Sequence, residues 1–248
     1  MSTTRARCVF CFDSGGLVRT GCACRGECAV VHVRCLVRAV VASGSQQAWV
    51  RCRLCNQEYT GPVSCALARV RSLSTDSDSP DAFFAEVHAI DALCESQKSL
   101  KAERRARALL ASTVARRGEE SDEACIVKLR VAIALVQQSR LAEAALIVVS
   151  ALDNEALKCQ TLTMLARIMH TSSRYSEAER VWRSLPVQEP SAALVTRVLL
   201  CETLAAQGAL CVDEIDRVVV DARRVFGAEH GLTRKATALR DVLRKKPL

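Results

Sequence analysis

The cysteines of this 248-residue chain are crowded at its N-terminus. Eight of the fourteen lie within the first 55 residues, and the other six are scattered singly from Cys65 to Cys211. A secreted chain would use so many cysteines for disulfides, but the stretch MSTTRARCVFC has no apolar signal region before its first cysteine pair. Metal binding is therefore the better interpretation of the N-terminal set, and the later cysteines are predicted to be small buried apolar residues.

The N-terminal set falls into four pairs at ligand spacing. Three pairs are cysteines and one joins a histidine to a cysteine: Cys8-x2-Cys11, Cys22-x-Cys24, His32-x2-Cys35 and Cys52-x2-Cys55. A tetrahedral zinc ion takes four nitrogen or sulfur ligands, and a two-residue gap lets one turn aim two side chains at one ion. Eight ligands in four pairs therefore predict two closed zinc sites. Cys28 is surplus and is expected to be a free thiol, with replacement of a neighbouring ligand as the alternative.

Closed zinc sites have structural roles. With every coordination position filled by protein, no water is activated, so hydrolytic metal catalysis is not indicated and no catalytic residue is assigned. A finger of this size has too small a core to fold alone, and metal binding supplies folding free energy on the order of ten kcal/mol per site. Two structural Zn2+ ions are therefore the predicted cofactors.

The ligand order of four cysteines, one histidine and three cysteines resembles that of the RING-CH (RINGv) finger. Ligands are interleaved in that family, which implies two sets: Cys8, Cys11, His32 and Cys35 for one zinc, and Cys22, Cys24, Cys52 and Cys55 for the other. A PHD finger shares the order, but it usually has a longer gap between its third and fourth ligands and a shorter one before the histidine. The short gap at Cys22-x-Cys24 and the seven residues before His32 favour RING-CH.

The resemblance implies a docking platform for a ubiquitin-conjugating enzyme that carries ubiquitin on a thioester. Such a ligase orients the reactants and forms no covalent intermediate. One family contact, just before the second ligand, falls on Phe10, and Leu54 in the loop of the last pair is expected to extend the same apolar groove. The position after the last ligand, often cationic in the family, is Asn56, which donates hydrogen bonds without a charge.

Two departures from the family pattern leave ligase activity open. Membrane-type RING-CH fingers usually carry a tryptophan four residues after the sixth ligand, where this chain has Ala39, and Asn56 replaces the cation. A zinc-stabilised adaptor or scaffold without ligase activity is therefore the alternative. The docking surface exists only if Phe10 and Leu54 are exposed beside each other and are not buried in the finger's own core.

The rest of the chain is predicted to be helical. Ala, Val, Leu and Arg dominate, and aromatic residues make up 4%, a composition of packed helices more than of sheets. After Gly61-Pro62, which is taken to end the metal module, a short helix from Ser64 to about Leu73 precedes the polar linker STDSDSPD. Helical patterning then covers about 81–95, 100–117 and 121–138.

A sequence repeat at a spacing of 34 residues lies in this helical region. The segment QQSRLAEAALIV from Gln137 aligns with TSSRYSEAERVW from Thr171. The period, the bulky residue at the turn and the small alanine soon after resemble the tetratricopeptide repeat (TPR). Ala132 and Ala166, one period apart, are predicted at close helix contacts. An irregular helical bundle with a coincidental match is the alternative.

A third, degenerate unit is predicted from Ala192 to Phe226, with its turn at Gly208. A helix from Leu232 to Lys245 would close the stack with a basic face. The predicted fold class is thus a small zinc-stabilised α+β RING-type finger followed by an all-α TPR-like domain. Its segments are a finger at 1–61, a short helix, linker and connecting helix at 62–100, and the repeats at 101–248.

The predicted partners are proteins. Stacked helix pairs form a concave surface that binds a peptide or helix, so the repeats are expected to select a protein substrate. Residues 1–70 hold nine arginines against three acidic residues, and no aromatic residues are interleaved for base stacking, which argues against nucleic acid. No run of about 18 apolar residues predicts a membrane span. A soluble, intracellular and cytoplasmic protein is expected, with the nucleus left open.

Overall fold

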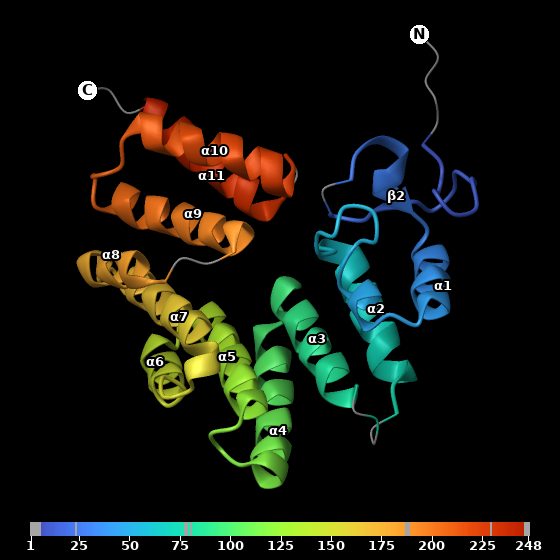
Figure 1. Ribbon diagram of the computed structural model, residues 1–248, viewed down its shortest axis with the longest axis horizontal. Helices are drawn as coiled ribbons and strands as arrows, with labels where there is room; N and C mark the ends of the chain where they lie inside the picture. Colours follow the sequence, from blue (N-terminus) through green and yellow to red (C-terminus); the bar gives the residue numbers. More distant parts are fainter. Residues whose placement is uncertain are drawn as a thin grey trace. The chain divides into compact units, whose positions relative to one another are not determined.

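The computed structural model describes residues 6–22, 24–76, 79, 81–186, 189–228 and 230–245. The chain divides into two compact units: Met1–Ser96 with Phe226–His230, and Gln97–Val225 with Gly231–Leu248. Figure 1 labels the helices along the chain. None of the helices in the described ranges is both long and apolar enough to cross a membrane.

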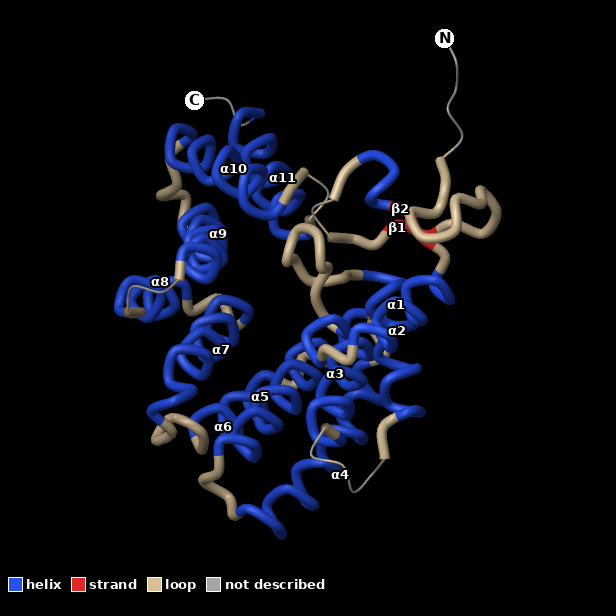
Figure 2. Tube along the Cα trace, turned by 45° about the vertical axis from the view of Figure 1, so that its right-hand side comes forward, coloured by secondary structure: helices blue, strands red, loops and turns tan. Residues whose placement is uncertain are grey.

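The first unit begins with very short elements. Strand β1 (Val18–Arg19) pairs antiparallel with β2 (Val30–Val31), with Val18 opposite Val31. The 3-10 helix η1, the helix α1 and the 3-10 helix η2 span Gly26–Ala29, Val33–Ser43 and Gln46–Trp49. Loops connect them, as Figure 2 shows. Two-residue strands cannot hold a sheet by themselves, so this part depends on other interactions for its fold.

Helices α2 (Gly61–Ser74) and α3 (Ala82–Glu95) pack on each other in the same unit. The expectation that Ser64 caps this helix is wrong. Thr60 is the N-cap, and Pro62 lies in the first turn, where its missing N–H is not needed. Val63 and Leu67 of α2 are fully buried in one cluster with metal-ligand candidates, so α2 supplies core to the finger.

The second unit is a series of helices joined by short turns. In chain order it comprises α4 (Ser99–Arg117), α5 (Asp122–Gln137), α6 (Leu141–Val149), the 3-10 helix η3 (Glu155–Leu157), α7 (Lys158–Thr171), α8 (Tyr175–Ser184), α9 (Pro190–Ala206), α10 (Val212–Phe226) and α11 (Gly231–Lys245). From α4 to α9 each α-helix packs on the next, and α11 packs on α9. The predicted helices at 100–117, 121–138 and 232–245 are confirmed to within one residue at each end.

The 34-residue sequence repeat is also a repeat of backbone conformation. Ser139 and Ser173, one period apart, follow α5 and α7 with left-handed φ angles of 61° and 60°. The next residues, Arg140 and Arg174, have φ, ψ of −87°, 61° and −86°, 58°. Each of these arginines donates its backbone N–H to the carbonyl five positions earlier, at 3.0 Å and 2.8 Å. The same helix-ending turn therefore connects both helix pairs.

Small side chains lie at the helix contacts of both repeats. Ala132 and its equivalent Ala166 are fully buried, as are Ala144 and its equivalent Ala178. A methyl side chain lets two helix backbones approach closely, and a larger one would push them apart. Ala132 and Ala166 are therefore buried in the helix packing, as a position of close contact requires.

The same kind of turn occurs at two further places. Gly208, between α9 and α10, has a φ of 74°, and Ala209 donates its N–H to Leu204 five positions earlier at 2.8 Å, so the predicted third turn is confirmed. Gln97, between α3 and α4, has a φ of 58°, and Lys98 after it has φ, ψ of −95°, 50°. The search at 34 residues missed this turn because α4 has 19 residues, whereas α6 has nine and α8 has ten.

The single cysteines outside the N-terminal set divide between core and surface. Cys94, Cys125 and Cys201 are buried, as predicted, and Cys65 and Cys159 are half-buried. Cys211 is exposed in the loop before α10, so the prediction is wrong there. A residue in a surface connection is placed by its loop and not by its apolar character.

A buried carboxylate joins α4 to the turn before α6. Glu103 is 8% exposed, and its oxygens accept hydrogen bonds from Arg107 Nε at 2.9 Å, Gln138 Nε2 at 2.9 Å and Arg140 Nη1 at 2.8 Å. Burial by itself would raise the pKa of Glu103, but the hydrogen bonds from Gln138 and Arg107 and the charge of Arg140 hold the pKa below its usual value. Glu103 is therefore ionised in the folded unit.

Replacing this carboxylate is expected to destabilise the second unit. For Glu103→Gln we expect the free energy of unfolding at neutral pH to fall by roughly 1–3 kcal/mol, because charge-assisted hydrogen bonds are lost. Since the pKa of Glu103 is lower in the folded than in the unfolded state, its contribution is present at neutral pH and disappears as the pH falls through the folded-state pKa. Urea unfolding of wild type and variant at neutral and acid pH measures both effects.

The matched control is Glu177→Gln, whose ion pair with Arg174 is more exposed. It should cost less than about 1 kcal/mol. A Glu103→Gln effect that is as small as this control, or that stays the same in acid, would contradict the role given to Glu103.

Candidate metal centre

The structure brings the eight predicted ligands into two groups of four. Within each group, one ligand atom from every residue lies within 4.8 Å of the others: Cys8, Cys11, His32 and Cys35 in the first group, and Cys22, Cys24, Cys52 and Cys55 in the second. These are the two interleaved sets that the RING-CH resemblance implies. Cys28 is exposed and belongs to neither group.

Two turns of one design present the outer cysteine pairs. The N–H of Cys8 donates to the Asp13 carbonyl at 2.9 Å, and the N–H of Phe12 donates to the Cys8 carbonyl at 2.8 Å. The corresponding bonds around Cys52, to Gln57 and from Asn56, are both 2.8 Å long. These turns fold each Cys-x2-Cys pair tightly enough for both sulfurs to reach one group.

The residue after each of these pairs has a left-handed backbone. Its φ is 62° at Phe12 and 55° at Asn56. Asparagine tolerates this conformation better than most residues, whereas an aromatic side chain there is strained. Asn56 therefore has a structural reason to follow the last ligand, which its family position did not reveal.

His32 lies at the start of α1 with its ring turned toward the first group. The side chain is buried, and Nδ1 lies 3.2 Å from Cys11 Sγ and 3.8 Å from Cys35 Sγ. A tetrahedral zinc ion would place its sulfur and nitrogen ligands about 3.6 Å apart. On the far side of the ring, Nε2 donates to the Gly15 carbonyl, which leaves the Nδ1 lone pair facing the cysteines. His32 is oriented as a metal ligand.

The second group has four thiols in very close contact. Cys24 Sγ and Cys52 Sγ are 3.7 Å apart, close to the roughly 3.8 Å sulfur separation around a tetrahedral zinc ion. The hydrogen bond with Cys22 lowers the pKa of Cys52 to about 4, while burial raises the pKa of Cys24 to about 12. In the absence of a cation, therefore, one thiol ionises while its neighbour keeps its proton. Four thiolates at this distance need a metal ion to ionise together.

A glycine is required where the chain enters the second group. Gly21, directly before Cys22, has a φ of 71°, and a Cβ there would lie 2.7 Å from the Thr60 carbonyl oxygen. The hydroxyl of Thr60 donates to the Gly21 carbonyl at 3.0 Å, and Thr20 Oγ1 lies 3.1 Å from Cys22 Sγ. The residue before α2 thereby fixes the loop that carries Cys22.

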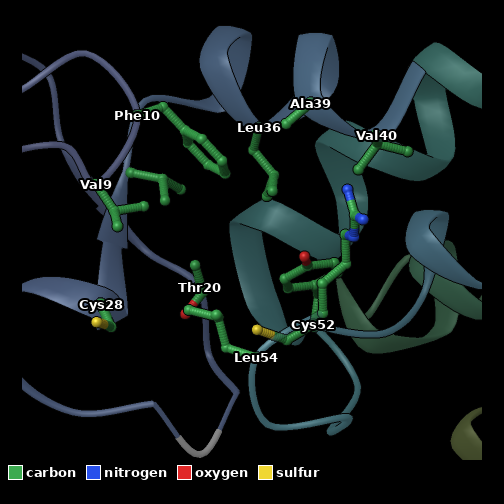
Figure 3. A pocket seen from close by; sticks show the side chains of 12 residues that line it. Val9, Phe10, Thr20, Cys28, Leu36, Ala39, Val40, Cys52 and Leu54 are labelled. Carbon is green, nitrogen blue, oxygen red and sulfur yellow. The ribbon is translucent and has the colours of Figure 1, made fainter. Parts of the chain in front are cut away.

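An apolar groove of about 390 Å3 lies on the finger beside the metal groups, and Figure 3 shows the side chains around it. Phe10, from the first Cys-x2-Cys turn, is 45% exposed, and Leu54, from the second, is 69% exposed. Both line the groove, together with the ligand candidate Cys52 and the surplus Cys28. The groove is also lined by residues that sequence analysis did not assign: Val9, Thr20, Val31, Leu36, Val40, Arg53 and Tyr59. The two predicted docking residues are therefore exposed on one surface.

The two residues that depart from the family pattern have different positions. Ala39, on α1, lines the groove. Asn56 is exposed and is not among the described residues that line the groove. The altered tryptophan position thus belongs to the groove itself, whereas the altered cation position lies outside it.

Comparisons with known proteins match solved structures and no protein family. No protein-family model matches the chain, and no curated protein is similar to it. Two similar crystal structures are of nearly identical TPR-like repeats of a candidate kinesin light chain from Podosopora anserina. One, a single-site variant, has a TM-score of 0.46 and 13% identity and covers 77% of this chain and 93% of that chain. The other has a TM-score of 0.44 and 11% identity and covers 86% and 95%.

Proposed function

We propose that the two groups hold two structural zinc ions in a RING-CH-type finger. The donor sets of three cysteines with one histidine and of four cysteines are those of structural zinc sites, and the measured separations fit a tetrahedral ion. The Gly15 carbonyl behind His32 supplies the outer hydrogen bond that metal-binding histidines usually have. When bound, zinc provides folding energy and no bond-breaking chemistry.

We propose further that the chain is an E3 ubiquitin-protein ligase or the ligase subunit of a complex. The observation that carries this proposal is the exposure of Phe10 and Leu54 on one apolar groove between the two metal turns. A partner loop with apolar side chains would bury Phe10 and Leu54. A few buried anchors of this kind usually give most of the binding energy at an interface. The finger would hold the conjugating enzyme, and the helical repeats would bind the substrate.

In this mechanism the ligase contributes position. It brings the thioester-linked ubiquitin and the substrate amine together, so the rate gain comes from proximity and orientation and needs no nucleophile of its own. Asn56, which is exposed after the last ligand, would donate a hydrogen bond to the docked ubiquitin in place of the family's cation.

A ubiquitin-transfer assay with a matched pair of phenylalanine variants tests the proposal. We expect the zinc-loaded protein to form ubiquitin chains with at least one member of a panel of conjugating enzymes. Phe10→Ala should reduce chain formation by at least about tenfold, because it removes a hot-spot anchor. Phe12→Ala is the control, since Phe12 is 71% exposed two residues away and does not line the groove.

Metal content must be measured on every protein, so that lost docking is separated from lost folding. Equal loss in Phe10→Ala and Phe12→Ala would contradict the groove as the docking site. If the folded wild type with both zincs forms no chains with any enzyme, the alternative stands: a non-catalytic zinc-binding adaptor for protein–protein interaction, which Ala39 and Asn56 favour.

A further inference from the structure

Helix α4 begins with positive charges that no described residue neutralises. Lys98 is the N-cap, and Lys101 and Arg104 follow at intervals of three residues. All three are exposed, and none makes an ion pair or side-chain hydrogen bond within the described part of the chain. Leu100, in the same two turns, is 72% exposed. We call these four residues the α4 basic start.

Two of the three other turns of this design carry balanced charges, and the third, at Gly208 and Ala209, carries none. Arg140, before α6, pairs with Glu143, and Arg174, before α8, pairs with Glu177. Lys98 takes the place of these arginines, because it follows the same left-handed residue with nearly the same backbone angles. The residue three positions after Lys98 is Lys101, where those two turns have glutamate. One turn design thus joins a cation to an anion twice, two uncharged residues (Ala209 and Val212) once, and two cations here.

The fold itself gains nothing from this arrangement. Cations near a helix N-terminus oppose the helix dipole, and like charges three residues apart repel each other. The exposed leucine adds apolar surface in contact with water. These residues oppose local helix stability, and no internal contact compensates for them. Such residues indicate a function other than stabilising the fold.

We propose that the α4 basic start binds an acidic peptide segment that carries an apolar side chain among its carboxylates. Charge complementarity selects the carboxylates, since the three cations lie along about 9 Å of helix, within reach of neighbouring side chains of one peptide. Leu100 selects for a peptide over a bare polyanion, because an exposed leucine gains only from apolar contact. The biological role of this site rests on the proposed function, because the acidic segment would belong to the substrate of the ligase.

A direct binding assay without conjugating enzyme or ubiquitin tests this inference separately from the ligase proposal. The probe is a fluorescein-labelled peptide of alternating Asp and Glu around a central Leu, read by fluorescence anisotropy against the full-length zinc-loaded protein. Wild type should bind it at least about tenfold more tightly than the peptide with Asn and Gln in place of the acids, and higher salt should weaken the binding.

Three variants locate the site. The double variant K101E/R104E should weaken binding at least about tenfold, and Leu100→Ser should weaken it about threefold. The control R180E/R234E makes the same change of net charge at exposed positions of α8 and α11 and should bind within about twofold of wild type. Circular dichroism of each variant shows that it is folded.

Several results would overturn the inference. Equal weakening by both double variants would show a response to net charge alone, and equal binding of the acidic and neutral peptides would exclude charge recognition. Tighter binding of a labelled oligo-dT strand than of the acidic peptide, with loss in K101E/R104E, would assign the surface to nucleic acid instead. A protein that binds the peptide but transfers no ubiquitin would refute the ligase proposal and leave the peptide site standing.

Discussion

Removing the proposed zinc ions is expected to unfold the first unit and leave the second unit folded. In the described part of the finger both strands have two residues, and the core cluster includes Cys8, Cys22 and Cys52 themselves. Without an ion, the four thiols of a group cannot ionise together, and nothing joins the sulfurs of the two Cys-x2-Cys turns. Loss of zinc should therefore remove on the order of ten kcal/mol of folding free energy per site, more than a small unit has in reserve.

The chain has two tryptophans, one in each unit, which lets each unit be followed separately. Trp49 packs against the finger core, and Trp182 is 3% exposed in the second unit. In a Trp182→Phe background, addition of a chelator should shift the Trp49 emission to that of an exposed indole. In a Trp49→Phe background the same chelator should leave the Trp182 emission unchanged.

A pair of cysteine variants gives the control for this experiment. Cys52→Ser should hold less than two zinc ions per chain by elemental analysis and should lose the native Trp49 signal, because a hydroxyl is a poor zinc ligand. Cys28→Ser, which changes an exposed cysteine outside both groups, should keep both ions and the signal. A wild type that remains folded and binds no zinc would refute the metal assignment.

Trp182→Ala is expected to destabilise the second unit by roughly 3–5 kcal/mol, the usual cost of removing a large buried aromatic side chain. The indole fills the space left by the small residues Ala166 and Ala178, and its Nε1–H donates to Thr203 Oγ1 at 3.2 Å. It therefore connects α7, α8 and α9. Its removal leaves a cavity and takes one hydrogen bond from Thr203 Oγ1 at the point where two successive repeats meet.

Urea unfolding followed by far-ultraviolet circular dichroism measures this cost. Trp182→Phe, which keeps most of the volume and loses the hydrogen bond, should cost clearly less than Trp182→Ala. Leu146→Ala is the control, since Leu146 is 73% exposed on α6 and should change stability by about 0.5 kcal/mol or less. An effect of Trp182→Ala as small as this control would mean that α8 does not depend on the packing described.

The candidate metal groups could be predicted from the sequence because ligand spacing is local. A two-residue gap defines a turn whatever surrounds it, so Cys8 to Cys11 and Cys52 to Cys55 could be identified as pairs. Which pairs share an ion is a question of tertiary structure, and only the family resemblance implied the interleaved sets. The Gly15 carbonyl behind His32 left no sequence signal, because a backbone oxygen is present in every residue.

The helical part shows where local patterns fail. The repeat at 34 residues was visible because α6 and α8 have nearly equal lengths, but the same turn at Gln97 was hidden by the longer α4. The start of α2 was misplaced because Gly61-Pro62 usually indicates a break, and here Pro62 occupies the one part of a helix that accepts it. The exposure of Phe10 and Leu54 depends on how the rest of the finger packs around them. No local sequence pattern predicts that packing.

The origin of the groove residues has a consequence for control of the protein. Phe10 comes from the turn of one metal group and Leu54 from the turn of the other, so neither group alone can form both sides of the groove. Docking of the partner would then require zinc in both groups. The fraction of molecules able to dock would be the product of the zinc occupancies of the two groups. If both groups have the same zinc affinity, the fraction of protein able to bind the partner is the square of the occupancy of one group. Near the zinc concentration that half-fills each group, partner binding would therefore fall more steeply with decreasing zinc than it would for a finger with one ion.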